Sequence, residues 1–214
     1  MAFDFKKEYK EFYMPSEKPQ VVVVPEANYL AVRGKGNPNE EGGEYKKAIE
    51  MLYTVAYTLK MSYKTDHRIE GFYEYVVPPL EGFWWQEGID GVDLTRKDEL
   101  CWISVIRLPE FITRADFEWA LQAASKKKKI DCSKVEFVTI NEGLCVQILH
   151  IGAYDDEPRS VAMMEEWVAQ NGYEMDLSAQ RLHHEIYLSD ARKTPTEKLR
   201  TVVRHPIRPV QALK

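Results

Sequence analysis

The sequence predicts an α+β fold in which antiparallel strands alternate with amphipathic helices. Hydrophobic residues make up 44% and charged residues 29% of the 214 residues, which is typical of a globular protein with a sizeable core. Runs rich in β-branched and aromatic residues indicate strands, and apolar residues three and four positions apart indicate helices. The order strand, glycine-ended loop, helix and two strands occurs twice, near residues 27–108 and 143–205. We therefore expect two βαββ modules in a pseudo-two-fold internal duplication, with a groove at their junction.

The first half of the chain contains one clear helix. Apolar residues at helical spacing, from Tyr45 to Leu59, predict an amphipathic helix over residues 44–62. Residues 1–20 are polar and charged and are expected to form a lead-in with at most a short helix. Strands are expected over residues 20–25, 27–36, 70–77 and 97–108.

Glycine and aromatic residues are concentrated between the last two of these strands. Pro78 and Pro79 should end the strand that precedes them. Residues 80–91 are rich in glycine and aromatic residues, and we expect a glycine-bounded loop over residues 82–88 that contains Trp84 and Trp85. Two tryptophans are costly to expose in a loop, so we expect them to fill the core or to close over a flat ligand.

The second half repeats the pattern. Thr113 is placed as the N-cap of a helix over residues 114–127. Pro158 suits the first turn of a second helix, over residues 160–170, which Asn171 and Gly172 should end. Strands are expected over residues 134–140, 143–152, 180–188 and 198–205. Pro206 should stop the last strand, which leaves residues 205–208 as a solvated tail.

Composition argues against several classes of protein. The net charge of −5 and the pI of about 5.7 give no electrostatic footprint for nucleic acid. No apolar run approaches the roughly 20 residues of a membrane helix, and the charged start does not resemble a signal peptide, so we expect a cytoplasmic protein. The three cysteines lie far apart without zinc-site spacing. Neither a nucleotide-binding glycine loop nor a GxSxG nucleophile motif occurs.

The most informative segment is His183-His184-Glu185-Ile186-Tyr187-Leu188-Ser189-Asp190, which reads as a strand. Alternation places His183, Glu185 and Tyr187 on one face, and the mostly apolar opposite face should pack on a helix. If the first face borders a pocket, an acid beside a phenol can bind a cation or activate a water. If it faces solvent, Glu185 would form an ordinary cross-strand salt bridge. Because neighbouring strand residues point to opposite faces, His183 and His184 cannot share one ion, and we expect neither a metal nor a cofactor.

Three strings carry a resemblance to a known family: residues 75–85 (YVVPPLEGFWW), 150–158 (HIGAYDDEP) and 184–190 (HEIYLSD). They resemble the GyrI-like small-molecule-binding domain, which is the effector-binding domain of multidrug-responsive transcription regulators, and in particular its stand-alone branch. The resemblance spans roughly residues 20–210. It implies a single domain over residues 1–214, with module one at about 20–110, a linking helix at about 113–128 and module two at about 134–210.

The resemblance also implies a place for the ligand. In the family, the groove lies on the sheet faces turned away from the helices, and a buried glutamate on the late strand is the binding acid. Glu185 matches that glutamate. The internal pairing of modules makes a monomer sufficient, although a homodimer stays open. The expected partner is a hydrophobic aromatic small molecule, with no direct contact to nucleic acid or membrane.

Two functions follow from the resemblance. Some stand-alone members that resemble this chain hydrolyse cyclopropane-containing, DNA-alkylating natural products, and others are known only as binders. In the first case Glu185 would be the base that activates water, and Tyr187 or His183 would donate a hydrogen bond to the developing oxyanion. In the second, Glu185 would pair with cationic aromatic ligands. The expected ligand-binding residues, each of which could instead belong to the core or the surface, are Tyr73, Tyr75, Trp84, Trp85, Tyr154, Trp167 and His183.

Overall fold

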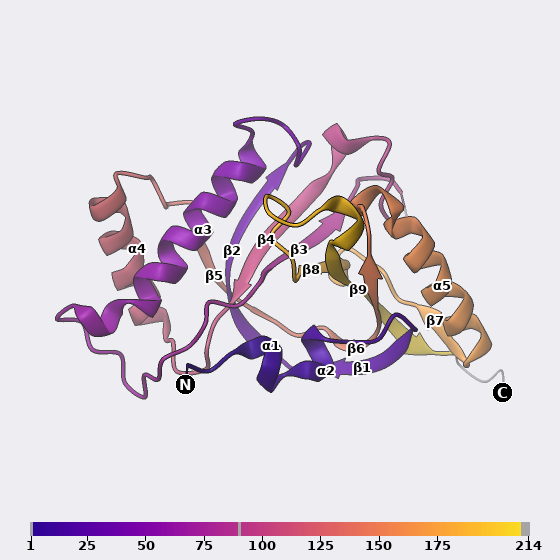
Figure 1. The fold of residues 1–214 in the computed structure, drawn as a ribbon, viewed down its shortest axis with the longest axis horizontal. Coiled ribbons are helices and arrows are strands. Elements are labelled where there is room, and N and C mark those ends of the chain that lie inside the picture. Colours follow the sequence, from indigo (N-terminus) through magenta and orange to yellow (C-terminus); the bar gives the residue numbers. More distant parts are fainter. Residues whose placement is uncertain (1, 90, 211–214) are drawn as a thin grey trace.

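The computed structural model describes residues 2–89 and 91–210 and confirms an α+β fold (Figure 1). Within these residues the strands form one nine-stranded antiparallel sheet, in the order β1-β6-β9-β8-β3-β4-β2-β5, with β7 added against β9. The strands are β1 (Gln20–Val24), β2 (Ala27–Lys35), β3 (Leu80–Trp85), β4 (Cys101–Arg107), β5 (Glu136–Ile140), β6 (Gly143–Ile151), β7 (Tyr173–Met175), β8 (His183–Tyr187) and β9 (Arg200–Pro209).

Five α-helices accompany the sheet in the described residues. They are α1 (Phe5–Glu8), α2 (Lys10–Tyr13), α3 (Glu44–Lys60), α4 (Arg114–Lys128) and α5 (Glu157–Gln170). The predicted N-cap of α4 is confirmed: the Thr113 side chain accepts a hydrogen bond from the Asp116 backbone N–H, and the Asp116 carboxylate accepts one from the Thr113 backbone N–H at 3.0 Å. Short 3₁₀ turns lie at Ser62–Lys64, Lys97–Glu99, Tyr154–Asp156 and Thr196–Lys198. No helix in the described part of the chain is long and apolar enough to cross a membrane.

The two halves of the sheet meet where β3 pairs with β8. Gly82 lies opposite Glu185, and Trp84 lies opposite His183. In each half a long strand (β2 or β6) leads into a helix (α3 or α5), and the two later strands pair beside it. This strand order suits two βαββ modules, while their origin by duplication stays a prediction.

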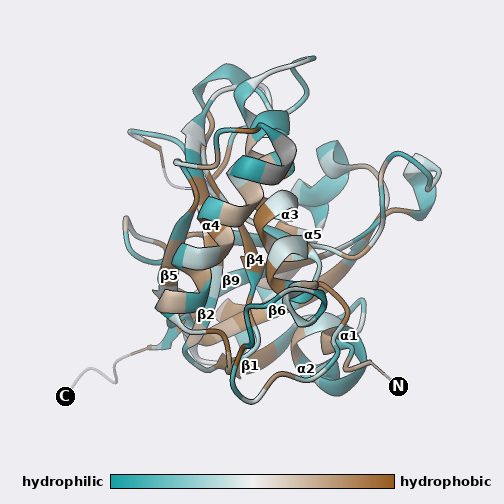
Figure 2. Ribbon diagram, turned by 90° about the vertical axis from the view of Figure 1, so that its left-hand side faces the viewer, coloured by the Kyte–Doolittle hydropathy of each residue, from teal (hydrophilic) through white to brown (hydrophobic). Residues whose placement is uncertain are grey.

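The helices α3, α4 and α5 lie on one face of the sheet (Figures 1 and 2). The α3 and α4 helices bury apolar residues against β2, β3 and β4, among them Leu52, Phe117 and Trp102. The α5 helix packs Met164 and Val168 on β6 and β9. On the opposite face, the α1–α2 segment buries Phe5 and Phe12. Most stabilisation of the sheet comes from this two-sided burial of apolar area.

Two expectations about residues 70–91 are wrong. Residues 70–77 form no strand, and only Tyr75 makes an isolated bridge, to Phe3. The strand is instead β3, which overlaps the expected loop at residues 82–85 and pairs with both β4 and β8. Glycine weakens a strand and often marks a close approach of other groups. The presence of Gly82 therefore argued against a strand here, although β3 is central and neighbouring side chains occupy the space beside Gly82.

The expected solvated tail at residues 205–208 is also wrong. His205 and Ile207 are both 2% exposed or less, and β9 continues through Pro206 to Pro209. Proline has no backbone N–H to donate to a ladder. At this point β9 changes partners: Pro206 is the last residue opposite β6, and Ile207 pairs with Met175 of β7. The change of partner accommodates proline inside a strand.

Candidate functional site

A groove of about 1660 Å³ opens on the helix-bearing face of the sheet. It lies over β3 and β8, between α3 and the start of α5, and the segment after β8 borders it. This volume exceeds the roughly 300–1,000 Å³ of common small-molecule sites. Residues from these elements that line it include Tyr45, Ile49, Tyr53, Leu80, Trp84, Tyr154, Glu157, Glu185, Tyr187 and Leu188.

The expected position of the groove, on the face away from the helices, is therefore wrong. Tyr187 and Trp84 belong to the hydrophobic cluster that α3 covers, and the Tyr45 ring of α3 lies 5.3 Å from the Trp84 ring. Because alternate residues of β8 share a face, Glu185 and His183 face the helices as well. The helices stand apart at the junction of the two halves, and the groove occupies the space between them.

Glu185 is held by two hydrogen bonds at the floor of this groove. His183 Nε2 donates to Glu185 Oε1 at 2.9 Å, and the Tyr187 hydroxyl donates to Oε2 at 2.7 Å. Burial by itself raises the pKa of this carboxyl, but the hydrogen bond and charge of His183 and the hydroxyl of Tyr187 outweigh it, so the pKa of Glu185 is lowered. Glu185 is therefore a carboxylate, although its residue is only 8% exposed.

The Tyr187 hydroxyl links Glu185 to Trp84, whose Nε1–H donates to it at 2.9 Å. Burial and the nearby Glu185 charge raise the pKa of Tyr187 well above its usual value, so it remains a phenol. Gly82 makes room for the pair, because a Cβ there would lie 2.7 Å from Trp84 Nε1 and 3.0 Å from the Tyr187 oxygen. Gly82, which argued against a strand in the sequence, is therefore required for the contact between Trp84 and Tyr187.

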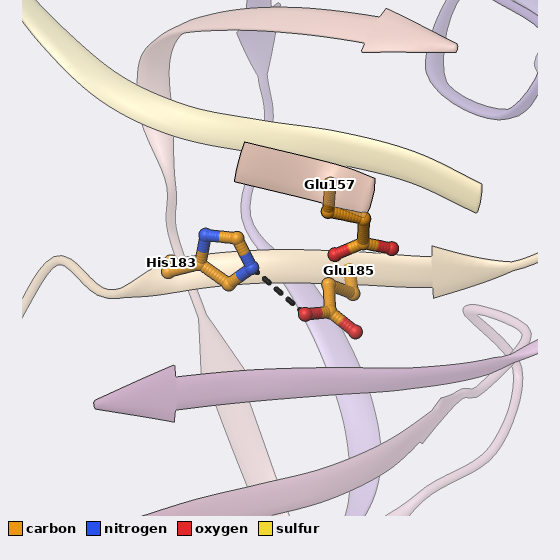
Figure 3. Close-up of side chains that lie close together, drawn as sticks. All are labelled: Glu157, His183 and Glu185. Carbon is orange, nitrogen blue, oxygen red and sulfur yellow. Dashed lines mark hydrogen bonds and ion pairs between the residues drawn. The ribbon is translucent and has the colours of Figure 1, made fainter. Parts of the chain in front are cut away.

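Glu157 is a second buried acid beside Glu185, and the sequence did not indicate it. It is the first residue of α5, and it offers a carboxylate oxygen that lies within 4.8 Å of the ligand atoms of His183 and Glu185 (Figure 3). Burial, followed by the charge of Glu185, raises the pKa of Glu157 well above its usual range. In the sequence, Glu157 closes the acidic run that precedes Pro158. Acidic residues at a helix N-terminus commonly complement the helix dipole in solvent, so nothing in the sequence indicated that Glu157 is buried.

His205 is the other residue that sequence reasoning missed. Its Nε2 lies 2.6 Å from Nδ1 of His183, and the two atoms share one hydrogen bond. Burial, together with the charge of His183, lowers the pKa of His205 well below its usual value, so His205 is neutral. It was assigned to a solvated tail because Pro206 follows it.

Some of the other expected residues reach the groove. Trp84 and Tyr154 line it, and the Tyr154 ring meets the Tyr187 ring edge-on at 5.8 Å. His183 lies beside Glu185 on the same face of β8 and contacts its carboxylate. Burial, and then the charge of Glu157, raises the pKa of Tyr154 to about 12, so its hydroxyl keeps its proton.

The structure does not bring the remaining four to the groove. Tyr73 and Tyr75 pack around Phe111, near the N-terminal segment. Trp85 packs on the opposite face of the sheet, in the cluster that contains Phe83. Trp167 stacks on Tyr173 between α5 and β7. The local sequence around these four aromatic residues does not distinguish them from Trp84, which does line the groove.

His184 lies on the face of β8 opposite α3, α4 and α5, where Ile186 packs against α1 and α2 as expected, and it belongs to a separate buried ion cluster. Its Nδ1 donates to Glu142 Oε2 at 2.8 Å, and its Nε2 lies 3.0 Å from Glu81 Oε2. Arg204 Nη1 donates to the other Glu142 oxygen at 2.8 Å, and Arg204 Nη2 donates to the backbone oxygen of Phe12 in α2. This cluster ties the N-terminal helices to the back of the sheet.

Similar proteins of known structure match nearly the whole chain. A hydrolase from Listeria innocua is 44% identical, with a TM-score of 0.88, over 97% of this chain and 100% of the other. A second structure, of an uncharacterized conserved protein from the same organism, is 47% identical with a TM-score of 0.91 and the same coverage. A third, also a hydrolase from L. innocua, is 46% identical with a TM-score of 0.90, again with the same coverage. No curated protein matches significantly. The profile of the GyrI-like small-molecule-binding domain matches residues 17–208, and the chain therefore belongs to the GyrI-like family.

Proposed function

We propose that the protein hydrolyses electrophilic, cyclopropane-containing small molecules that alkylate DNA, and so detoxifies them. The observation that carries this proposal is the Glu185 carboxylate, oriented by Tyr187 and His183 at the floor of an aromatic groove. The similarity to structures of hydrolases supports an enzymatic role. The cyclopropane substrate comes from the family resemblance, and it fits a wide aromatic groove that accepts flat molecules.

The reaction would add one water to the substrate. Glu185 takes a proton from a water as the water oxygen bonds to a ring carbon, and the strained carbon–carbon bond breaks. The electron pair of that bond moves onto a conjugated carbonyl, which becomes an enolate and takes up a proton from solvent, while Glu185 releases its proton to solvent. The product is a ring-opened alcohol that no longer alkylates DNA.

The hydrogen bonds refine the roles expected from sequence. Tyr187 and His183 both donate to Glu185, so they orient the base and are not free to meet the developing oxyanion. Tyr154 is better placed for that task, because it lines the groove and its hydroxyl keeps its proton. A hydroxyl fixed beside an enolate oxygen stabilises the charge that appears in the transition state.

The decisive experiment follows turnover of a neutral conjugated cyclopropane by mass spectrometry, where the product gains the mass of one water. Glu185→Gln should fold normally and lose roughly 10²- to 10⁴-fold in kcat, the usual contribution of a general base. Glu50→Gln is the matched control, because Glu50 lines the groove from the exposed side of α3. Wild-type turnover by the Glu185 variant would rule out Glu185 as the base.

A second candidate function is binding without chemistry. Among the described residues, no lysine or arginine forms an ion pair with Glu157 or Glu185, so a cationic aromatic ligand could pair with the Glu185 carboxylate from the groove. In that case Glu185→Gln would weaken binding of a cationic ligand more than that of its neutral isostere. Incubation of the wild-type protein with the cyclopropane would then yield no water adduct.

A further inference from the structure

Glu157, His183 and Glu185 converge from two elements on one small space. Figure 3 shows the Glu157 side chain, at the start of α5, lying over the Glu185 carboxylate, with the His183 imidazole beside it on β8. One donor atom from each residue lies within 4.8 Å of the other two, and all three residues are buried. Sequence reasoning considered only adjacent histidines, which cannot share an ion. It did not cover two residues on the same strand face joined by an acid from a distant helix.

The donor set and its spacing suit a small transition metal ion. One imidazole nitrogen and two carboxylate oxygens form a ligand set of the type that holds zinc with one position left open. With bonds of about 2.0–2.2 Å, ligand atoms around such an ion lie roughly 3.3 Å apart. His183 Nε2 and Glu185 Oε1 are already 2.9 Å apart, so side-chain rotation of Glu157 would complete the set without movement of the sheet.

A second, independent observation points to a missing ligand. Glu157 is only 4% exposed, and its Oε1 has no hydrogen-bond partner among the described residues. A buried oxygen without a partner costs free energy, and the Glu157 carboxylate lies beside that of Glu185 (Figure 3). Neither carboxylate has a lysine or arginine ion-pair partner in the described part of the chain, so the two buried acids share His183 as their basic neighbour.

The residues behind the three donors resemble the outer shell of a metal site. His183 Nδ1 is hydrogen-bonded to His205, which fixes the ring so that Nε2 faces the cluster. The Tyr187 hydroxyl holds the second oxygen of Glu185. Both acids also line the groove, so a fourth position on the ion would open towards it.

We propose that Glu157, His183 and Glu185 bind a divalent transition ion of the zinc type, with an exchangeable position that faces the groove. The site goes beyond the proposed hydrolysis and does not depend on it, because a pure binding protein would hold the ion equally well. A bound ion and a free base are alternative states of Glu185, since both use the same carboxylate lone pairs.

The test uses Co²⁺, whose visible ligand-field absorption reports coordination by nitrogen and oxygen. Titration of the metal-free full-length protein should give an intense band that saturates at one equivalent and is removed by Zn²⁺. Glu157→Gln should weaken Co²⁺ binding at least about tenfold. Glu165→Gln is the matched control, because Glu165 lies exposed on the same helix and its loss should change nothing.

Several results would overturn the proposal: no saturable band, an equal loss in the Glu165 variant, or unchanged affinity in a folded Glu157 variant. Should Glu157→Gln fail to fold, wild-type crystals soaked in Zn²⁺ provide a second measurement. Anomalous density between the three side chains is expected there, and density elsewhere only would refute the site. Because these readouts need no substrate, they succeed or fail separately from the turnover of Glu185→Gln.

Discussion

The buried ion cluster behind the sheet makes Glu142→Gln a quantitative test of how charge stabilises this fold. The Glu142 side chain is 8% exposed and accepts hydrogen bonds from His184 and Arg204. Burial alone would raise its pKa, but the charges of His184 and Arg204 outweigh burial and lower the pKa of Glu142 to about 2. Removal of this one acid leaves two buried cations with less compensation.

The expected magnitude follows from the pKa. The difference between a folded-state pKa of about 2 and a reference value of 4.5 corresponds to about 3 kcal/mol of stability at neutral pH. Loss of one partner from a buried pair commonly costs about 3–5 kcal/mol, which agrees. Because the folded-state pKa is depressed, this contribution is present above about pH 4.5 and is lost as the pH falls through about 2.

The assay is urea unfolding of both proteins at a series of pH values. The difference in unfolding free energy should be about 3–5 kcal/mol at pH 6 and should shrink steadily as the pH falls below 4.5. Glu136→Gln is the control, because Glu136 also pairs with an arginine, Arg33, but both side chains are about half exposed. That change should cost at most about 1 kcal/mol. Parallel pH curves for wild type and Glu142→Gln would refute the assignment.

Two further substitutions test local geometry. Gly82→Ala should destabilise the protein by about 1–3 kcal/mol in urea unfolding, because its Cβ would meet Trp84 and Tyr187. Combining it with Tyr187→Phe should recover part of the lost stability, because the hydroxyl that the new Cβ meets is then absent. Fully additive losses in the double variant would contradict the clash. Thr113→Ala should cost about 1 kcal/mol in the same assay, since it removes the side-chain acceptor for the Asp116 backbone N–H, while turnover stays at the wild-type rate; a loss below about 0.3 kcal/mol would show that the cap is dispensable.

Residues whose pattern is local were predictable from the sequence. The amphipathic spacing in α3 and the Thr113 cap of α4 depend on neighbours within a turn or two, so both appeared where expected. The β3 strand did not, because its identity depends on partners about 20 and 100 residues away, in β4 and β8. Pro206 misled for a similar reason: only the pairing of β9 with β7 shows how a strand can continue past it.

The site was half predictable. Alternation on one strand placed His183, Glu185 and Tyr187 on a common face, and the structure brings them together. Which side of the sheet that face addresses is a global property, and the expectation was wrong. Glu157 and His205 join the cluster from a helix end and a neighbouring strand. Such convergence leaves no trace in the local spacing of residues.

The position of β9 has a consequence for how the protein is made. This strand is the last of the sheet in chain order, yet it lies between β6 and β8 and carries His205. A nascent chain that has reached β8 can pair β3 with β4 and β8, and β1 with β6, but β6 and β8 lack their common neighbour β9. Vectorial synthesis therefore leaves both edges exposed to misassembly until residues 200–209 emerge. The same late step that closes the sheet creates the environment of Glu185, so no partly made chain could display the finished site.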